Sequence, residues 1–172
     1  SRLMNLVPSN GRLIAGIDSP VVRDVLTEMD GKLNTTIETF GLSDDAKWQS
    51  RYIDFTDTTR FTVFKDGNSW GEFETHLIGE FNVRNCLAVI AAAEAWGVDW
   101  KITRDALASF KSVRRRCEVR GEVNGVTVID DFAHHPTAVR ETLAALRTKY
   151  ADGRLIAVFE PRSRTSCHAT FQ

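Results

Sequence analysis

Long apolar runs, an excess of charge of one sign and paired cysteines are all missing from this sequence. No stretch of about 18 apolar residues is present, so no segment is expected to span a membrane. The 22 basic and 23 acidic residues leave a formal net charge of −1, which gives no electrostatic case for binding nucleic acid or an anionic membrane. The three cysteines, Cys86, Cys117 and Cys167, form no CxxC motif. We therefore expect reduced thiols in a cytoplasmic protein.

The beginning of the chain lacks two further features. Residues 1–4 carry neither an apolar signal-peptide region nor an initiator methionine at position 1. We therefore expect a piece of a longer protein. With 172 residues, 42% hydrophobic and 26% charged, the chain has a globular composition and is long enough for one domain or for parts of two.

The first part of the chain predicts an α/β fold. An apolar strand is expected over residues 11–17, a helix from Pro20 to Met29, and a β-branched strand over 35–40. A strand, a helix and a second strand in this order favour parallel pairing.

Three strand-like runs follow, over residues 52–55, 60–65 and 70–78. The turn at residues 66–68, Asp-Gly-Asn, joins the last two runs into a hairpin. We expect an antiparallel patch beside the α/β core.

Two helices are expected next. The stronger one covers residues 83–96, with Asn82 as its N-cap and Gly97 just after its last turn. The second covers residues 103–110. Three apolar side chains are predicted to face inward from it: Ala106, Leu107 and Phe110.

A basic linker over residues 112–116 separates two unlike patterns. We expect a partial central ATP-binding domain over 1–111 and a partial C-terminal domain over 117–172. Beyond the linker, apolar and charged residues alternate from Arg116 to Val123, which predicts a strand with one apolar face.

The rest of the second pattern is a hairpin, a helix and a strand. Asn124-Gly125 predicts a tight turn into a strand over 126–129. Pro136 opens a helix, and residues 155–159 are expected to form a further buried strand. The helix is predicted to carry three apolar residues on one face: Val139, Leu143 and Leu146.

Two amides lie near the predicted start of the stronger helix. Asn82 and Asn85 are one turn apart, and an Asn side chain both donates and accepts, as the edge of an adenine ring requires. The simpler interpretation is that Asn82 only caps the helix and Asn85 is an ordinary polar residue of the first turn. Residue chemistry alone favours this simpler interpretation.

A cluster of acidic and histidine residues follows the strand at 126–129. Asp130, Asp131, His134 and His135 lie where a strand ends and a helix begins, which is the usual place for a ligand in an α/β sheet. A metal site is rejected, because adjacent histidines rarely face one ion and no third group of ligands is visible. A ligand site and a merely structural capping Asp with packed histidines are equally compatible with the pattern.

Arginines mark two other candidate positions. The linker carries Arg114, Arg115 and Arg116, and an Arg that crosses a cleft between domains can bind phosphates bidentately. Arg162 follows the strand predicted over 155–159. Exposed, solvated arginines are the alternative at both positions.

Taken together, these motifs resemble the Mur ligase family. They are GEFNVRN, an Ala-rich helix, FKSVRRRCEVRGEVNGVTVIDDFAHHPTA and EPRSRT, in this order. The resemblance implies the later part of a central ATPase domain, containing the antiparallel patch, followed by the start of a Rossmann-like C-terminal domain. It covers nearly the whole chain, and its specific part is the carboxyl half.

The resemblance implies an ATP- and Mg²⁺-dependent ligase of bacterial cell-wall metabolism. The implied reaction activates UDP-N-acetylmuramate as an acyl phosphate and joins it to the recycled tripeptide L-alanyl-γ-D-glutamyl-meso-diaminopimelate. The implied nucleotide-binding residues are Asn82, Asn85, Arg116, Asp131 and His134. Arg162 would lie near the incoming peptide, and no residue is assigned a catalytic role or a metal.

Two departures from the family pattern affect this interpretation. Position 81 is Phe where the family commonly has His, and no GxxxxGK[ST] phosphate-binding loop occurs in the sequence. We therefore expect the 172-residue chain to be inactive by itself. Two alternatives stay open: the relative that adds alanine to UDP-N-acetylmuramate, and a non-catalytic nucleotide-binding module.

Overall fold

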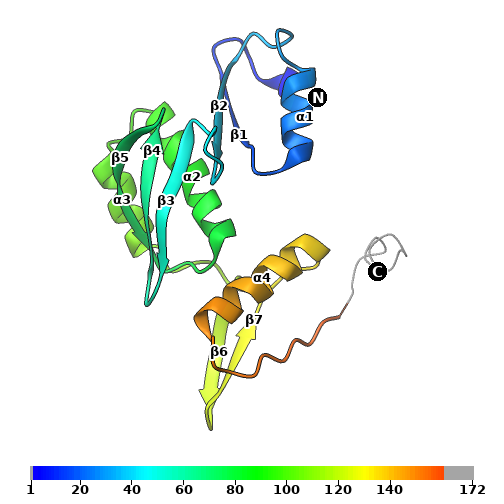
Figure 1. Cartoon of the computed structure of the whole chain (residues 1–172), viewed down its shortest axis with the longest axis vertical. Helices are drawn as coiled ribbons and strands as arrows, with labels where there is room; N and C mark the ends of the chain where they lie inside the picture. The colour runs from blue at the N-terminus through cyan, green and yellow to red at the C-terminus, as the bar shows by residue number, and fades with distance from the viewer. Residues whose placement is uncertain (1, 161–172) are drawn as a thin grey trace.

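A computed structural model of the chain describes residues 2–160 (Figure 1). The first half is built on one five-stranded sheet with the strand order β1-β2-β3-β4-β5. Its strands are β1 (Arg12–Gly16), β2 (Thr36–Gly41), β3 (Trp48–Phe55), β4 (Thr59–Lys65) and β5 (Asn68–Thr75). A short 3₁₀ turn, η1 (Met4–Leu6), precedes the sheet.

Pairing in this sheet is mixed. β1 and β2 pair in parallel, as expected from the α/β pattern, and β2 pairs in parallel with β3. β3, β4 and β5 are antiparallel, so the expected antiparallel patch continues the same sheet. Asp66 and Gly67 both have positive φ, which is the requirement of the predicted tight turn between β4 and β5.

Three helices accompany the sheet. They are α1 (Pro20–Glu28), α2 (Glu80–Ala95) and α3 (Trp100–Ser109). α2 crosses one face of the sheet and α3 lies against β5 (Figure 1). Gly97 ends α2 with φ +74, and the amides of Gly97 and Val98 bond back to Glu94 and Ala93. This is the Schellman arrangement expected at a C′ glycine.

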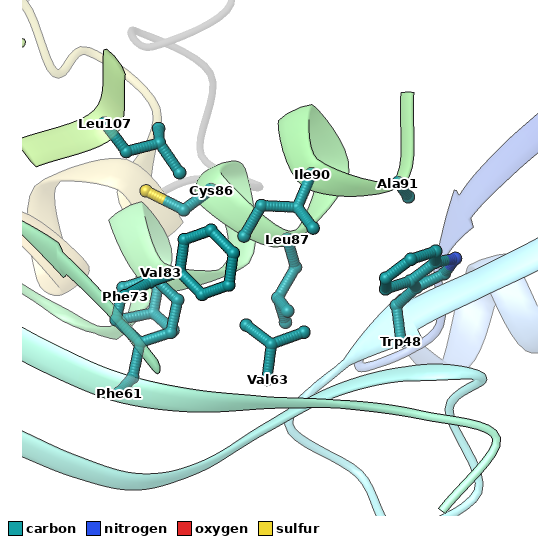
Figure 2. Close-up of a cluster of buried hydrophobic side chains, with 10 residues drawn as sticks. All are labelled: Trp48, Phe61, Val63, Phe73, Val83, Cys86, Leu87, Ile90, Ala91 and Leu107. Carbon is teal, nitrogen blue, oxygen red and sulfur yellow. The ribbon is translucent and has the colours of Figure 1, made fainter. Parts of the chain in front are cut away.

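The hydrophobic core lies between α2 and the sheet (Figure 2). α2 contributes Val83, Cys86, Leu87, Ile90 and Ala91, which face the apolar side chains of the sheet. The sheet contributes Trp48, Phe61, Val63 and Phe73, and α3 contributes Leu107. This half therefore buries a continuous apolar layer of its own.

Two expectations for the helices are wrong. α2 begins at Glu80 with Gly79 as its N-cap, not with Asn82, because Gly79 takes φ +91, which only glycine adopts easily. In α3 only Leu107 of the three predicted inward residues is buried, while Ala106 and Phe110 are exposed. α3 instead turns Trp100 towards Trp70 and Phe73, which rotates the inward face.

The second half consists of a hairpin and a helix. β6 (Glu118–Val123) and β7 (Val126–Asp130) are antiparallel, and α4 (Pro136–Lys149) follows them. Asn124 and Gly125 both have positive φ, as the predicted turn requires. On α4, Leu146 is buried and Val139 and Leu143 are half-buried. The other buried side chains of this helix are Thr142 and Ala145.

Two strand predictions fail in this half. The alternation from Arg116 to Val123 does not form one strand with a buried face. Arg115 and Cys117 have left-handed φ, so β6 starts only at Glu118. The valines of the hairpin are exposed, whereas Ile129 is half-buried. Residues 155–159 run extended and exposed, and pair with no strand in the described part of the chain. Apolar composition alone does not provide the neighbouring strands that burial requires.

No helix among residues 2–160 has the length and apolar character needed to cross a membrane.

Candidate functional site

A large cavity lies where the two halves meet. It has a volume of about 1070 Å³ and is lined by α2, α3, the linker, the segment after β7 and the first turns of α4. We call it the interdomain cleft. Four of the five predicted nucleotide-binding residues line it: Asn82, Asn85, Arg116 and Asp131. Segments far apart in the sequence therefore converge on one space.

The wall of the cleft formed by the two helices is mainly apolar. Val89 and Ala93 of α2 face this space, together with Ile102 of α3 and Phe110, the residue that follows α3. Phe110 is 44% exposed although the helical pattern predicted it to be buried. An apolar slot edged by a few polar groups is the usual form of a small-molecule site.

The two amides of α2 differ in how much of their hydrogen-bonding capacity is used. Asn82 Nδ2 donates to the Ile78 carbonyl at 2.8 Å, and Asn82 Oδ1 accepts from Asn85 Nδ2 at 3.3 Å. Asn82 therefore ties the first turn to the preceding loop. Among the described residues, the Asn85 amide oxygen has no donor. Asn85 is thus the amide that keeps a free acceptor and a free N–H for a ligand in the cleft.

Asp131 joins three segments through its carboxylate. Oδ2 accepts from the Cys117 amide at 2.8 Å, while Oδ1 accepts from the Ala133 amide at 2.7 Å and the Thr142 hydroxyl at 3.4 Å. The Cys117 thiol also hydrogen-bonds to this carboxylate. The structural role considered for an Asp at this position is thus present.

The two histidines lie in different surroundings. His134 Nδ1 lies 3.0 Å from the Phe132 carbonyl, its ring packs edge-on against Phe132, and it does not line the cleft. His135 does line it, and its Nδ1 accepts from the Thr137 amide at the N-cap of α4. That His135 lines the cleft was not predicted from the sequence. The signal was Pro136: a proline at the first helical position marks the preceding residue, here His135, as the N-cap.

The arginines of the linker point in different directions. Arg115 Nε lies 3.5 Å from the Asp130 carboxylate, and the guanidinium covers the Phe132 ring. Arg116 forms no ion pair in the described part of the chain and lines both the interdomain cleft and a neighbouring cavity of about 390 Å³. Arg116 is therefore the linker arginine that faces the interdomain cleft without an ion-pair partner in residues 2–160.

The cysteines at the cleft are poor nucleophiles. Burial raises the pKa of Cys86 to about 11. Burial, together with the nearby Asp131 carboxylate, raises the pKa of Cys117 to about 12. Both thiols stay protonated near neutral pH, which argues against thiolate chemistry at this site.

Two further predictions concern Arg162 and metal binding. Arg162 lies outside the described residues. Within residues 2–160, no group of three or more His, Cys, Asp or Glu side chains could hold a metal ion.

Comparison with known proteins identifies the two halves separately. The profile of the Mur ligase middle domain matches residues 1–93, and that of the Mur ligase glutamate ligase domain matches residues 115–171. The chain belongs to the Mur ligase family. The family resemblance of its motifs is thereby confirmed, as is the α/β fold with parts of a middle and a C-terminal domain.

Two similar Mur ligases carry different names. The UDP-N-acetylmuramate–L-alanyl-γ-D-glutamyl-meso-2,6-diaminoheptandioate ligase of Escherichia coli K12 is 43% identical over 95% of this chain and 35% of its own length. The UDP-N-acetylmuramate–L-alanine ligase of Anaeromyxobacter sp. Fw109-5 is 40% identical over 94% of this chain and 34% of its own. The chain thus spans about a third of the length of the curated relatives it matches.

Solved structures of Mur ligases also resemble this chain. The murein peptide ligase of Psychrobacter arcticus 273-4 superposes with a TM-score of 0.66 at 37% identity, covering 95% of this chain and 34% of that structure. An alanine ligase from Thermotoga maritima superposes with a TM-score of 0.62 at 28% identity, covering 67% and 27%. Both kinds of Mur ligase therefore share this arrangement of elements.

Proposed function

We propose that the protein to which these residues belong is an ATP-dependent ligase, and that ATP binds in the interdomain cleft. The proposal rests on one observation: Asn82 and Asn85 from α2, Arg116 from the linker and Asp131 from the segment after β7 line a single space. The profile matches to residues 1–93 and 115–171 support the proposed division into domains over 1–111 and 117–172, with a linker over 112–116.

Each part of the nucleotide has a chemically suitable partner in the cleft. The apolar wall of α2 and α3 suits the adenine ring, and the Asn85 amide can donate to and accept from its edge. Asp131 lines the same cleft and would face the ribose. Arg116 can bind phosphate oxygens with two parallel hydrogen bonds. His134 lies away from the cleft. Its proposed contact with the nucleotide is therefore limited to the nucleotide's edge.

Magnesium does not fit the described residues. No group of three or more His, Cys, Asp or Glu side chains in residues 2–160 could hold a metal ion, so we derive no step through the metal here. What the described residues supply is orientation of the nucleotide across the two halves.

For the acceptor substrates, we propose UDP-N-acetylmuramate and the tripeptide L-alanyl-γ-D-glutamyl-meso-diaminopimelate, with Arg162 near the peptide. The motif spanning residues 120–138 and the 43% identity to the E. coli ligase support the tripeptide. The 40% identity to an alanine ligase makes L-alanine the second candidate. Reaction in the cytoplasm, as part of peptidoglycan recycling, belongs to the same proposal.

Product analysis tests the choice of substrate. The intact protein is incubated with ATP, Mg²⁺ and UDP-N-acetylmuramate, together with either the tripeptide or L-alanine, and the products are identified by mass spectrometry. We expect the tripeptide adduct with release of ADP and phosphate. Formation of the alanine adduct alone would assign the protein to the other branch. ATP binding without either product would favour the non-catalytic module.

A further inference from the structure

The two halves meet where α4 contacts α2. The approach is close at Gly79, the N-cap of α2, because a Cβ placed there would come within 2.6 Å of the Ala145 Cβ. Ala145 is buried, as are its neighbours Thr142 and Leu146. The inward face of α4 therefore rests on the beginning of α2.

One ion pair links these two helices. Arg84 Nη2 of α2 lies 2.5 Å from Glu141 Oε2 of α4, with 24% and 32% of the two side chains exposed. Partial burial on both sides distinguishes this pair from a fully exposed ion pair, whose contribution is usually negligible. In the described part of the chain, Arg84 is the only cation paired with Glu141.

Carboxylates of the first half hold Arg84 independently of α4. Arg84 Nη1 lies 3.8 Å from Glu80, one turn earlier on α2, and 4.0 Å from Asp18 after β1. Asp18 is itself anchored, because its carboxylate accepts from the amides of Leu42 and Ser43 and from the Ser43 hydroxyl. The guanidinium is thus preorganised to receive Glu141, and less side-chain entropy is lost when the pair forms.

Burial alone would raise the pKa of Asp18. The hydrogen bonds from Ser43 and Leu42, together with the nearby Arg84, instead hold that pKa below its ordinary value. Asp18 therefore stays ionised at neutral pH and continues to orient Arg84.

The pair adjoins both walls of the interdomain cleft. Arg84 directly precedes Asn85, and Glu141 directly precedes Thr142, whose hydroxyl donates to Asp131 at 3.4 Å. Arg84 and Glu141 also line the cleft themselves. Separation of this pair would move Asp131 away from the amides of α2.

We propose that Arg84 and Glu141 are positioning residues: their ion pair holds α4, and with it Asp131, against the Asn85 wall and so sets the nucleotide affinity of the cleft. This inference rests on the proposed function, because it takes the ligand of the cleft to be ATP. Neither residue needs to touch the reacting atoms.

Kinetics of the intact protein test the effect on the nucleotide. Glu141→Gln and Arg84→Gln should each raise the KM for ATP about three- to tenfold, and the double variant should add little to either single one. Arg84→Lys should recover part of the loss. Raising the ionic strength should increase the KM of the unsubstituted protein more than that of Glu141→Gln. Additive single effects and equal salt responses would overturn the proposal.

A matched control is available inside the first half. The pair of Arg60 Nε and Glu74 Oε2, at 3.3 Å, joins β4 to β5 away from the cleft. Glu74→Gln should leave the KM for ATP unchanged. Melting temperatures of all variants report whether folding is affected.

A measurement without nucleotide separates this proposal from the proposed function. Spin labels on non-canonical residues at Asp57 and Val123 report the distance between the halves in the apo protein. Glu141→Gln should broaden that distance distribution. An unchanged distribution would overturn the positioning role. A broadened distribution with an unchanged KM for ATP would instead overturn the cleft as the nucleotide site.

Discussion

The two halves of this chain are stabilised in different ways. The first half buries a layer of apolar side chains between α2 and its sheet, with Trp48, Leu87 and Ile90 completely inaccessible to solvent. In the described part of the second half, only Thr142, Ala145 and Leu146 of α4 are buried. The hairpin valines remain more than half exposed.

This difference shows that burial does not follow from the apolar pattern of a segment alone. β6 and β7 are about as rich in valine as β4 is in apolar residues, but their valines stay exposed. On α4, the buried Ala145 lies against Gly79 at the start of α2. Substitutions should therefore lower stability most in the first half, whereas substitutions at the junction should act mainly on ligand affinity.

The largest expected effect is the removal of a core side chain from the first half. Leu87→Ala should lower the free energy of unfolding by about 2–5 kcal/mol, because Leu87 is fully buried and leaves a cavity. Val128→Ala, at a position 56% exposed on the hairpin, should change it by less than about 0.5 kcal/mol. Chemical denaturation measures both. Equal losses would mean that the hairpin is buried to a similar extent in the intact protein.

The second prediction uses pH to weaken the first half. Burial alone would raise the pKa of Glu38. The hydrogen bond from Trp48 Nε1, with Lys47, Arg12 and Lys65 nearby, instead holds that pKa below its ordinary value of 4.5. The stabilisation is therefore complete above about pH 4.5 and is lost as the pH falls through the lower, folded-state pKa.

Glu38→Gln should accordingly lower the unfolding free energy at pH 7 by about 1–3 kcal/mol and flatten its decline in acid. Denaturation curves between pH 3 and pH 7 check this. Glu118→Gln on the exposed hairpin is the matched control and should alter the acid dependence much less. If the Glu38→Gln variant lost stability in acid to the same extent as the unsubstituted protein, Glu38 would not be a source of the acid dependence.

The third prediction concerns the point where the halves touch. Gly79→Ala should lower stability by about 1–3 kcal/mol, because φ +91 is a glycine conformation and the new methyl group meets Ala145. It should also raise the KM for ATP, since α4 is displaced. Gly31→Ala also changes a glycine of positive φ (+68), but with open space around it, and should leave the KM unchanged. Matching KM values for the two variants would show that the junction does not affect the cleft.

The fourth prediction compares two arginines of the second half. Arg116→Ala should lower kcat/KM for ATP at least about tenfold, equivalent to about 1.4 kcal/mol, because Arg116 lines the cleft. Arg120 pairs with Glu118 on the hairpin, and Arg120→Ala should have a much smaller effect. Arg116→Lys should recover only part of the loss. Steady-state kinetics measure these effects, and thermal melts check that the variants fold. Small and equal effects of the two Ala variants on kcat/KM would mean that Arg116 is only a solvated residue.

The smallest expected change in stability is at Asn85. Asn85→Ala should shift the unfolding free energy by less than about 0.5 kcal/mol, since Ala is the better helix former at this exposed position of α2. The same variant should weaken ATP binding by about 1 kcal/mol or more. Calorimetric titration with a non-hydrolysable ATP analogue measures the affinity of the variant and of the unsubstituted protein. Unchanged affinity would show that Asn85 does not contact the base.

Local signals in the sequence predicted much of the fold. The dipeptides Asp66-Gly67 and Asn124-Gly125, Pro20 and Pro136 at helix starts, and Gly97 after α2 all mark boundaries that the structure has. Each works through the conformational preference of one or two residues, and therefore needs no knowledge of distant neighbours. The family motifs are local in the same sense.

Some of the wrong predictions depended on distant contacts. The inward face of α3 follows from the position of Trp70 and Phe73. The burial expected for residues 155–159 would have needed neighbouring strands. Hydrophobic periodicity identifies a face but does not specify what covers it.

The sequence by itself thus determined the order of helices and strands, the turns and the family. Only the tertiary structure decided which side chains share a space: that Asn85, Arg116 and Asp131 border one cleft, that His135 rather than His134 lines it, and that Arg84 meets Glu141. The physical reason is that turn and helix preferences act within a few residues. Contacts between remote segments depend instead on how whole layers pack, and that packing is a property of the complete fold.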